Sequence, residues 1–293
     1  MDNIDYSALT NKNIYLGFLK ASANNYGIDR CDNIEFEYDI DEEDQKQLSS
    51  FFDFSILIDV DELSTFTNAV NWVSEKLFSK KSSDIKKENS FSIINNVIKG
   101  EYAANCYAHA VVLNDIFRLL GYKARYIFCM PIDYHFADNH VVNLVFSKKE
   151  KRWMMFDAAQ NLYYTDDNGK VMDIRTFRNY LIRGENINVN LLPVYWASLK
   201  DNRERMLYFE KVLIYMSKNM YRFACFKNGQ KDRLAQGRVV EIINLVPNTY
   251  IDIPFSHKQF NKMDQTMLIN KYISNPDVFW EIPNNTHETI INN

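Results

Sequence analysis

The chain has 293 residues, of which 46% are hydrophobic and 25% are charged, a balance typical of a globular protein that buries a large core. Its formal net charge of −4 argues against a general nucleic-acid-binding protein, which would need clustered lysine and arginine side chains. The sequence contains no apolar run long enough to span a membrane and no apolar signal segment near its start, so we expect a cytoplasmic protein.

The four cysteines are scattered along the chain and form no close pair of the CxxC type. They are Cys31, Cys106, Cys129 and Cys225. A chain of this length needs no disulfide framework, so we expect free thiols in a reducing compartment. Of the four, we expect all but Cys106 to be structural.

Hydrophobic spacing predicts three helices in the first hundred residues: a short one near 14–23, one over 61–78 and one over 91–99. A polar loop is expected over 80–89. Residues 29–44 form an acidic run without the central glycine of an EF-hand loop, so it predicts a solvated surface rather than a calcium site.

The central region is the most strongly patterned. A helix is predicted from Asn105 to Leu120, and Gly121 follows it in the position of a helix-terminating glycine. Strands are predicted over 123–130, 140–146 and 152–158. A charged turn of five residues, 147–151, joins the last two strands as an antiparallel hairpin.

The C-terminal part carries no chemical motif. A helix is expected over 203–219 and strands over 220–226 and 238–245. We therefore divide the chain into an N-terminal segment (1–59), a core (60–189) and a C-terminal extension of unknown role (190–293). The extension would wall the cleft, form a separate small domain or dock a protein partner.

Three polar residues of the core stand at positions suited to nucleophilic catalysis. Cys106 follows the good N-cap residue Asn105, so the helix dipole and free backbone N–H groups would stabilise its thiolate. His140 opens an apolar strand, and Asp157 lies in the next strand, where a carboxylate needs a partner. Cysteine, histidine and aspartate can together form a thiolate with an oriented imidazole base.

The core resembles the transglutaminase-like superfamily, whose centre is papain-like. The resemblance covers roughly residues 60–185, and four stretches carry it: NCYAHA at the nucleophile helix, FRLLGYKARY at its end, NHVVNLVF at the base strand and RWMMFDAA at the acid strand. Two positions depart from the usual pattern. Ala104 stands where the family has glycine two residues before the cysteine, and Ala158 where it has proline after the aspartate.

The resemblance implies an α+β fold in which the cysteine helix packs on an antiparallel sheet. It implies that Cys106 is the nucleophile, His140 the base and Asp157 the residue that orients the base. The expected reaction is acyl transfer on an amide through a thioester, with hydrolysis of a peptide or protein substrate preferred. The alternatives are transamidation and a non-catalytic binding or accessory module on the same fold.

Other histidines offer competing interpretations. His109 lies one helical turn after Cys106 and is a rival base, although it is poorly aimed at that side chain. His135 would gate the cleft or lie in a solvated loop. Cys106, His109, His135 and His140 could also be read as zinc ligands, but they lack the tight ligand pairs of zinc sites, so we expect neither a metal nor another cofactor.

Overall fold

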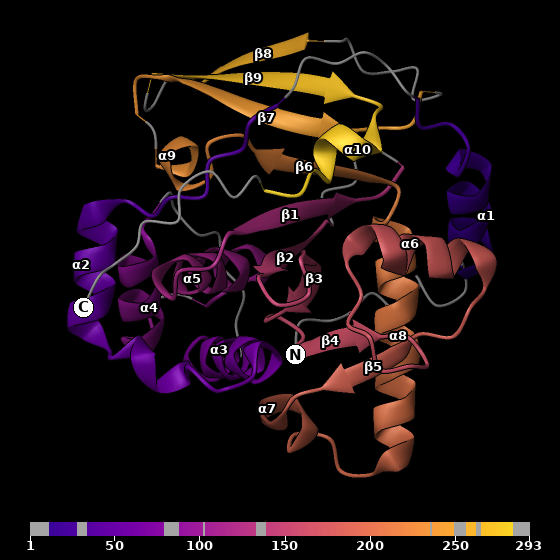
Figure 1. Ribbon diagram of the computed structural model, residues 1–293, viewed down its shortest axis with the longest axis horizontal. Helices are drawn as coiled ribbons and strands as arrows, with labels where there is room; N and C mark the ends of the chain where they lie inside the picture. The colour runs from indigo at the N-terminus through magenta and orange to yellow at the C-terminus, as the bar shows by residue number, and fades with distance from the viewer. Residues whose placement is uncertain are drawn as a thin grey trace.

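A mixed β-sheet with strand order β5-β4-β3-β2-β1-β6-β7-β9-β8 runs through the molecule in the computed structural model (Figure 1). The structure describes residues 12–27, 34–78, 88–101, 103–132, 139–234, 236–248, 256–261 and 265–283. The strands are β1 (Ala124–Met130), β2 (His140–Ser147), β3 (Arg152–Asp157), β4 (Leu162–Thr165), β5 (Asn188–Leu191), β6 (Arg222–Phe226), β7 (Val239–Leu245), β8 (Ser256–Asn261) and β9 (Thr266–Ile273). Among these strands only β7 and β9 pair in parallel.

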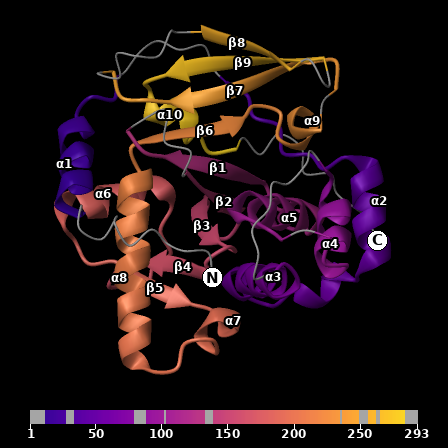
Figure 2. The same cartoon turned by 180° about the vertical axis from the view of Figure 1, so that it is seen from behind.

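Helices cover both faces of the sheet, as the two opposite views show (Figures 1 and 2). The helices are α1 (Lys12–Ser22), α2 (Glu42–Phe51), the 3₁₀ helix η2 (Phe54–Leu57), α3 (Glu62–Lys76), α4 (Ser90–Ile98), α5 (Cys106–Leu119), α6 (Ile174–Arg183), α7 (Pro193–Trp196), α8 (Asn202–Asn219), α9 (Gln230–Arg233) and α10 (Pro276–Phe279). In one buried cluster the helices α2, α3, α4 and α5 pack against one face of the central strands. In a second cluster α1, α6 and α8 pack against the opposite face.

Local chemistry sets both ends of α5. The Asn105 side chain accepts a hydrogen bond from the Ala108 N–H at 3.0 Å, which satisfies a first-turn donor. At the other end Gly121 has φ +81°, and the Tyr122 N–H reaches the Phe117 carbonyl at 2.9 Å. This left-handed glycine ends the helix, as the sequence predicts, and the chain turns directly into β1.

The β2–β3 hairpin is fixed by its register and by a contact with α3. Asn143 lies opposite Phe156, and Ser147 opposite Arg152. Across the hairpin turn, the Glu62 carboxylate accepts a hydrogen bond from the Ser147 hydroxyl at 2.5 Å and one each from the N–H groups of residues 148 and 149 at 3.2 Å. The tip of the hairpin is thereby held against the start of α3.

The expected α+β architecture with the cysteine helix on an antiparallel sheet is confirmed. The helices expected in the first hundred residues correspond to α1, α3 and α4, and the three expected central strands to β1, β2 and β3. One expectation was wrong: the acidic run is not wholly solvated, because Asp44 in α2 is only 1% exposed. Residues 29–33 of that run and 80–87 of the expected polar loop lie outside the described residues.

The chain after residue 190 continues the same sheet. Strand β6 pairs with β1 through Phe128 and Ala224, and β7, β9 and β8 follow outward from β6. Helix α8 packs on the face of the sheet opposite α5. The proposed boundaries at 59 and 189 remain a prediction. No helix within the described ranges is long and apolar enough to cross a membrane.

Candidate active site

Cys106 is the first residue of α5, and its side chain is partly exposed. The residue packs against the buried cluster on the α5 face of the sheet, and Ala104, two residues earlier, is buried. The first N–H groups of a helix have no partner within the helix, and the aligned peptide dipoles favour negative charge there. The fold therefore places a partly exposed sulfur at the N-terminal end of a helix.

His140 and Asp157 meet inside the protein. The His140 Nε2 atom lies 2.6 Å from Asp157 Oδ2, and the two residues are 2% and 0% exposed. The register Asn143–Phe156, extended by one residue, places residue 142 opposite Asp157, so His140 is its diagonal neighbour on the same face of the hairpin. A diagonal pair of this kind is within reach of a long side chain and a carboxylate.

Cys106 completes the group of three by a side-chain hydrogen bond with His140. Because Nε2 is occupied by Asp157, the other ring nitrogen, Nδ1, is the atom left for the sulfur. Burial alone would lower the pKa of His140, but the Asp157 charge and the hydrogen bonds with Asp157 and Cys106 outweigh burial and raise this pKa to about 10. The arrangement therefore favours an imidazolium beside the sulfur at neutral pH.

The second oxygen of Asp157 is also occupied. Asp157 Oδ1 accepts a hydrogen bond from the Gln160 N–H at 3.0 Å. The Gln160 side-chain oxygen and its backbone carbonyl both accept hydrogen bonds from the Tyr208 hydroxyl of α8. Both carboxylate oxygens therefore have donors, which fixes the plane of the carboxylate and the direction in which it holds the imidazole.

The other described cysteines sit in different surroundings. Cys129 of β1 lies opposite His140 in the sheet and is fully buried. Burial, with a smaller effect from the nearby Asp157 and Cys106, raises the pKa of the Cys129 thiol well above its usual value. Burial likewise raises the pKa of Cys225 to about 11. Both thiols therefore stay protonated and unreactive at neutral pH, and Cys31 lies outside the described residues.

His109, the alternative candidate for the base, makes its contact within its own helix. His109 Nδ1 lies 2.9 Å from the Asn105 carbonyl oxygen of its own helix, and His109 is 8% exposed. His135 lies outside the described residues. In the described part of the chain, no three or more His, Cys, Asp or Glu side chains are grouped so that they could hold a metal ion.

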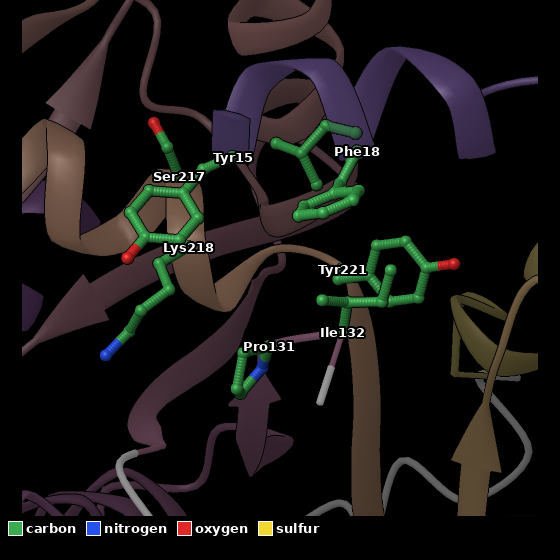
Figure 3. Close-up of a pocket in the computed structure, with 8 residues that line it drawn as sticks. Tyr15, Phe18, Pro131, Ile132, Ser217, Lys218 and Tyr221 are labelled. Atoms are coloured by element: carbon green, nitrogen blue, oxygen red, sulfur yellow. The ribbon is translucent and has the colours of Figure 1, made fainter. Parts of the chain in front are cut away.

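A cavity of about 150 Å³ lies on the same side of the sheet as α8 (Figure 3). Its walls come from α1, from Pro131 and Ile132 just after β1, and from the end of α8 at Ser217 and Lys218. None of the three candidate catalytic residues lines this cavity. We therefore assign it no part in the chemistry at Cys106.

The sequence analysis did not identify the residues of α8 that contact the candidate triad or its hydrogen-bond partners. Tyr208 reaches Gln160, and the ring of Tyr215 lies 5.3 Å from that of His140. The two tyrosines are seven residues apart and so share one face of the helix. The seven-residue spacing is visible in the sequence. No nearby residue, however, indicates which part of the protein this face of the helix contacts.

Comparisons with known proteins match part of the chain. Residues 59–158 match the family model of the transglutaminase-like superfamily. The matched segment is about a third of the chain. A search of curated proteins finds no match. Among solved structures, the chain is similar to one from Cytophaga hutchinsonii described as "a Putative Cysteine Protease", with 17% identity, a TM-score of 0.30 and coverage of 53% of this chain and 50% of that chain.

The match thus spans half the length of that solved structure, and a similarity this low carries no argument about activity. The family match is more specific, because it begins before α3 and ends just after β3. The segment that holds Cys106, His140 and Asp157 therefore matches the family model of the transglutaminase-like superfamily.

Proposed function

We propose that the protein hydrolyses an amide bond of a peptide or protein substrate through a thioester on Cys106. One observation carries the proposal: a partly exposed cysteine at a helix N-terminus is hydrogen-bonded to His140, which a buried carboxylate holds at 2.6 Å. A histidine of this kind beside a thiol can activate the sulfur as a nucleophile.

The first half of the reaction forms the thioester. The Cys106 thiolate attacks the amide carbon, and the carbonyl oxygen takes the negative charge. The Cys106 N–H, at the first position of α5, is a donor for that oxygen. The His140 imidazolium gives the proton on its Nδ1 side to the leaving amine as the C–N bond breaks. His140 ends this half neutral, and Asp157 keeps the other ring nitrogen protonated.

The second half releases the acyl group. Neutral His140 takes a proton from water as the water oxygen attacks the thioester carbon. The C–S bond then breaks, the acid leaves, and the Cys106 thiolate is restored beside the imidazolium. A primary amine in place of water would give transamidation by the same steps, so the triad alone does not choose the acceptor.

Selective alkylation tests the first requirement of the proposal. Folded protein is treated with iodoacetamide near pH 7, and the labelled cysteines are identified by mass spectrometry. Cys106 is expected to react much faster than Cys129 and Cys225, whose thiols are buried and protonated. Equal rates for these three thiols would remove the activated thiolate on which the proposal depends.

A trapped intermediate tests the chemistry itself. Incubation with a library of peptide amides and esters, followed by acid quenching and mass spectrometry, is expected to show an acyl group on Cys106. The Cys106→Ala variant is the control and must form no adduct. Release of free acid in water supports hydrolysis, whereas product formed only with an added amine would assign transamidation. A protein that keeps its biological effect as Cys106→Ala would instead be a binding module.

A further inference from the structure

Helix α8 lies outside the segment that matches the family, yet it contacts the candidate triad. The family match ends at residue 158, and α8 spans Asn202–Asn219. Figures 1 and 2 show it crossing the end of the sheet that carries β4 and β5, on the face away from α5. One surface of this helix holds Tyr208, Val212 and Tyr215 at i, i+4 and i+7.

Tyr215 contacts His140 in two ways. Its ring meets the imidazole edge-to-face, with centroids 5.3 Å apart and planes at 72°. Its hydroxyl donates a hydrogen bond at 3.3 Å to the carbonyl oxygen of Asn139, the residue immediately before His140. The helix therefore holds both the side chain and the backbone at the point where β2 begins.

Tyr208 extends the same support to Asp157. Its hydroxyl holds Gln160, whose N–H donates to Asp157 Oδ1. Burial, with smaller effects from Tyr195 and Asp157, raises the pKa of Tyr208 well above its usual value, so this hydroxyl remains a donor over the whole range in which a cysteine hydrolase works. One helix face thus reaches both partners of the imidazole–carboxylate pair.

We propose that Tyr215 is a positioning residue for His140, and that α8 thereby makes the C-terminal region part of the catalytic apparatus. The proposal rests on the proposed function of Cys106, His140 and Asp157. The Tyr215 ring covers one side of the imidazole, and the hydroxyl sets the position of the strand that carries it. Excluding water on that side strengthens the attraction between the imidazolium and the buried carboxylate.

Several charged or titratable groups surround the imidazole. Asp157 approaches from β3, Cys106 from α5, and Cys129 lies beside it on β1. On α8 itself the Lys218 ammonium lies 4.9 Å from the centre of the Tyr215 ring. Burial lowers the pKa of His140, and the Asp157 charge together with the hydrogen bonds with Asp157 and Cys106 raises it by more. Water that entered after loss of the Tyr215 ring would weaken both effects. The pKa of His140 would therefore fall toward its ordinary value.

The experiment measures the pKa of His140 directly, without substrate. Protein carrying ¹³C-labelled histidine is titrated by NMR, and the His140→Gln variant identifies the signal. Tyr215→Leu, which removes both ring and hydroxyl, is expected to lower this pKa by about one unit, a tenfold change in proton affinity. Tyr215→Phe removes only the hydroxyl and is expected to lower it by about half a unit, roughly threefold.

Tyr180 of α6 provides the matched control. It is another half-buried tyrosine that packs against the same buried cluster as Tyr215. Tyr180→Leu and Tyr180→Phe are expected to lower the melting temperature without moving the titration of His140. The pH profile of Cys106 alkylation provides a second readout, and its alkaline inflection should move with the pKa of His140 in the Tyr215 variants only.

The outcomes separate clearly. Titrations that are equal in the wild type and in both Tyr215 variants would overturn the proposal and leave Tyr215 as ordinary core packing. Shifts of the same size in the Tyr180 variants would overturn it as well. If Tyr215→Leu does not fold, the comparison of Tyr215→Phe with Tyr180→Phe decides. A protein that forms no acyl-enzyme would refute the proposed hydrolysis while leaving the titration result to stand or fall by itself.

Discussion

Asn143 of β2 donates a side-chain hydrogen bond at 2.8 Å to the carbonyl oxygen of Ala110 in α5. Asn143 is fully buried, and it lies three residues after His140. Ala110 lies four residues after Cys106, one turn along the helix. This bond therefore joins α5, which carries the thiol, to β2, which carries the imidazole. It fixes the position of the helix along the strand.

Removing this link is expected to cost both stability and alignment. Asn143→Ala loses a buried hydrogen bond and leaves a small cavity, so we expect the free energy of unfolding to fall by about 2 kcal/mol. Urea unfolding measures the change, and Asn186→Ala, at an exposed position, is the control. An Asn143→Ala protein of wild-type stability and wild-type Cys106 alkylation rate would show that packing alone aligns α5 with β2.

Replacing the carboxylate tests the orienting role. Asp157→Asn keeps the shape of the side chain but removes the charge that holds the His140 imidazolium. We expect kcat/KM on an amide substrate to fall by about 10²- to 10⁴-fold, because without the carboxylate the neutral imidazole can adopt the wrong tautomer, in which Nδ1, the nitrogen nearer the sulfur, carries the proton. Steady-state kinetics on a substrate found by acyl-enzyme trapping gives the ratio. Activity within threefold of wild type would mean that Asp157 is only a structural partner.

The pH dependence of stability offers a test that needs no substrate. The pKa of His140 is raised in the folded protein to about 10, above its ordinary value of 6.5. The native state therefore holds this proton more tightly than the unfolded state does. The resulting stabilisation is complete below about pH 6.5 and is lost as the pH rises toward about 10.

We therefore expect the free energy of unfolding to fall from pH 7 to pH 10 more steeply in the wild type than in His140→Gln, which lacks the titrating group. Urea unfolding at half-unit intervals of pH measures the two slopes. Parallel slopes would contradict a raised pKa at His140.

Local sequence signals were sufficient for much of the site. The boundaries of α5 followed from Asn105 and Gly121, whose capping effects act within a few residues. Asp157 in an apolar strand required a partner, and His140 at the start of the neighbouring strand was within reach. Each of these inferences used either one element or one short hairpin. Over that range, the separation of two residues in the sequence determines how far apart they lie in the structure.

The remaining features depend on contacts between distant parts of the chain. The Tyr215 hydroxyl donates to the carbonyl oxygen of Asn139, 76 residues earlier in the chain. No sequence pattern around Tyr215 predicts this contact. The parallel pairing of β7 with β9 is likewise set by tertiary packing. The acidic run was read by its charge, but Asp44 is buried because Gln230 and Arg233 approach it from α9, almost 190 residues further along.

Asp44 and Asp115 form a buried pair of carboxylates that shares one guanidinium. The Arg233 side chain lies 2.7 Å from Asp115 but 3.9 Å from Asp44, so Asp115 receives the closer contact. Gln230 donates a hydrogen bond to each carboxylate. Burial and the neighbouring Asp115 charge, opposed by Arg233, raise the pKa of Asp44 to about 7.

A raised carboxyl pKa has a defined consequence for stability. The folded protein binds the Asp44 proton more tightly than the unfolded chain, whose value is near 3.8. This contribution is complete below about pH 4, is lost as the pH rises to about 7, and is absent above that pH. Asp44→Asn, which is neutral at every pH, is therefore expected to be more stable than the wild type at pH 8 by at least about 1 kcal/mol.

That advantage should shrink as the pH falls from 7 toward 4, where Asp44 becomes protonated in the wild type. Asp115→Asn is the matched control, because it removes the closer partner of the buried Arg233 and should destabilise the protein by about 3 kcal/mol at pH 8. Urea unfolding of the three proteins at pH 5 and pH 8 distinguishes the cases. An Asp44→Asn protein less stable than the wild type at pH 8 would mean that Arg233 stabilises the Asp44 carboxylate in the folded protein and that the pKa of Asp44 is not raised.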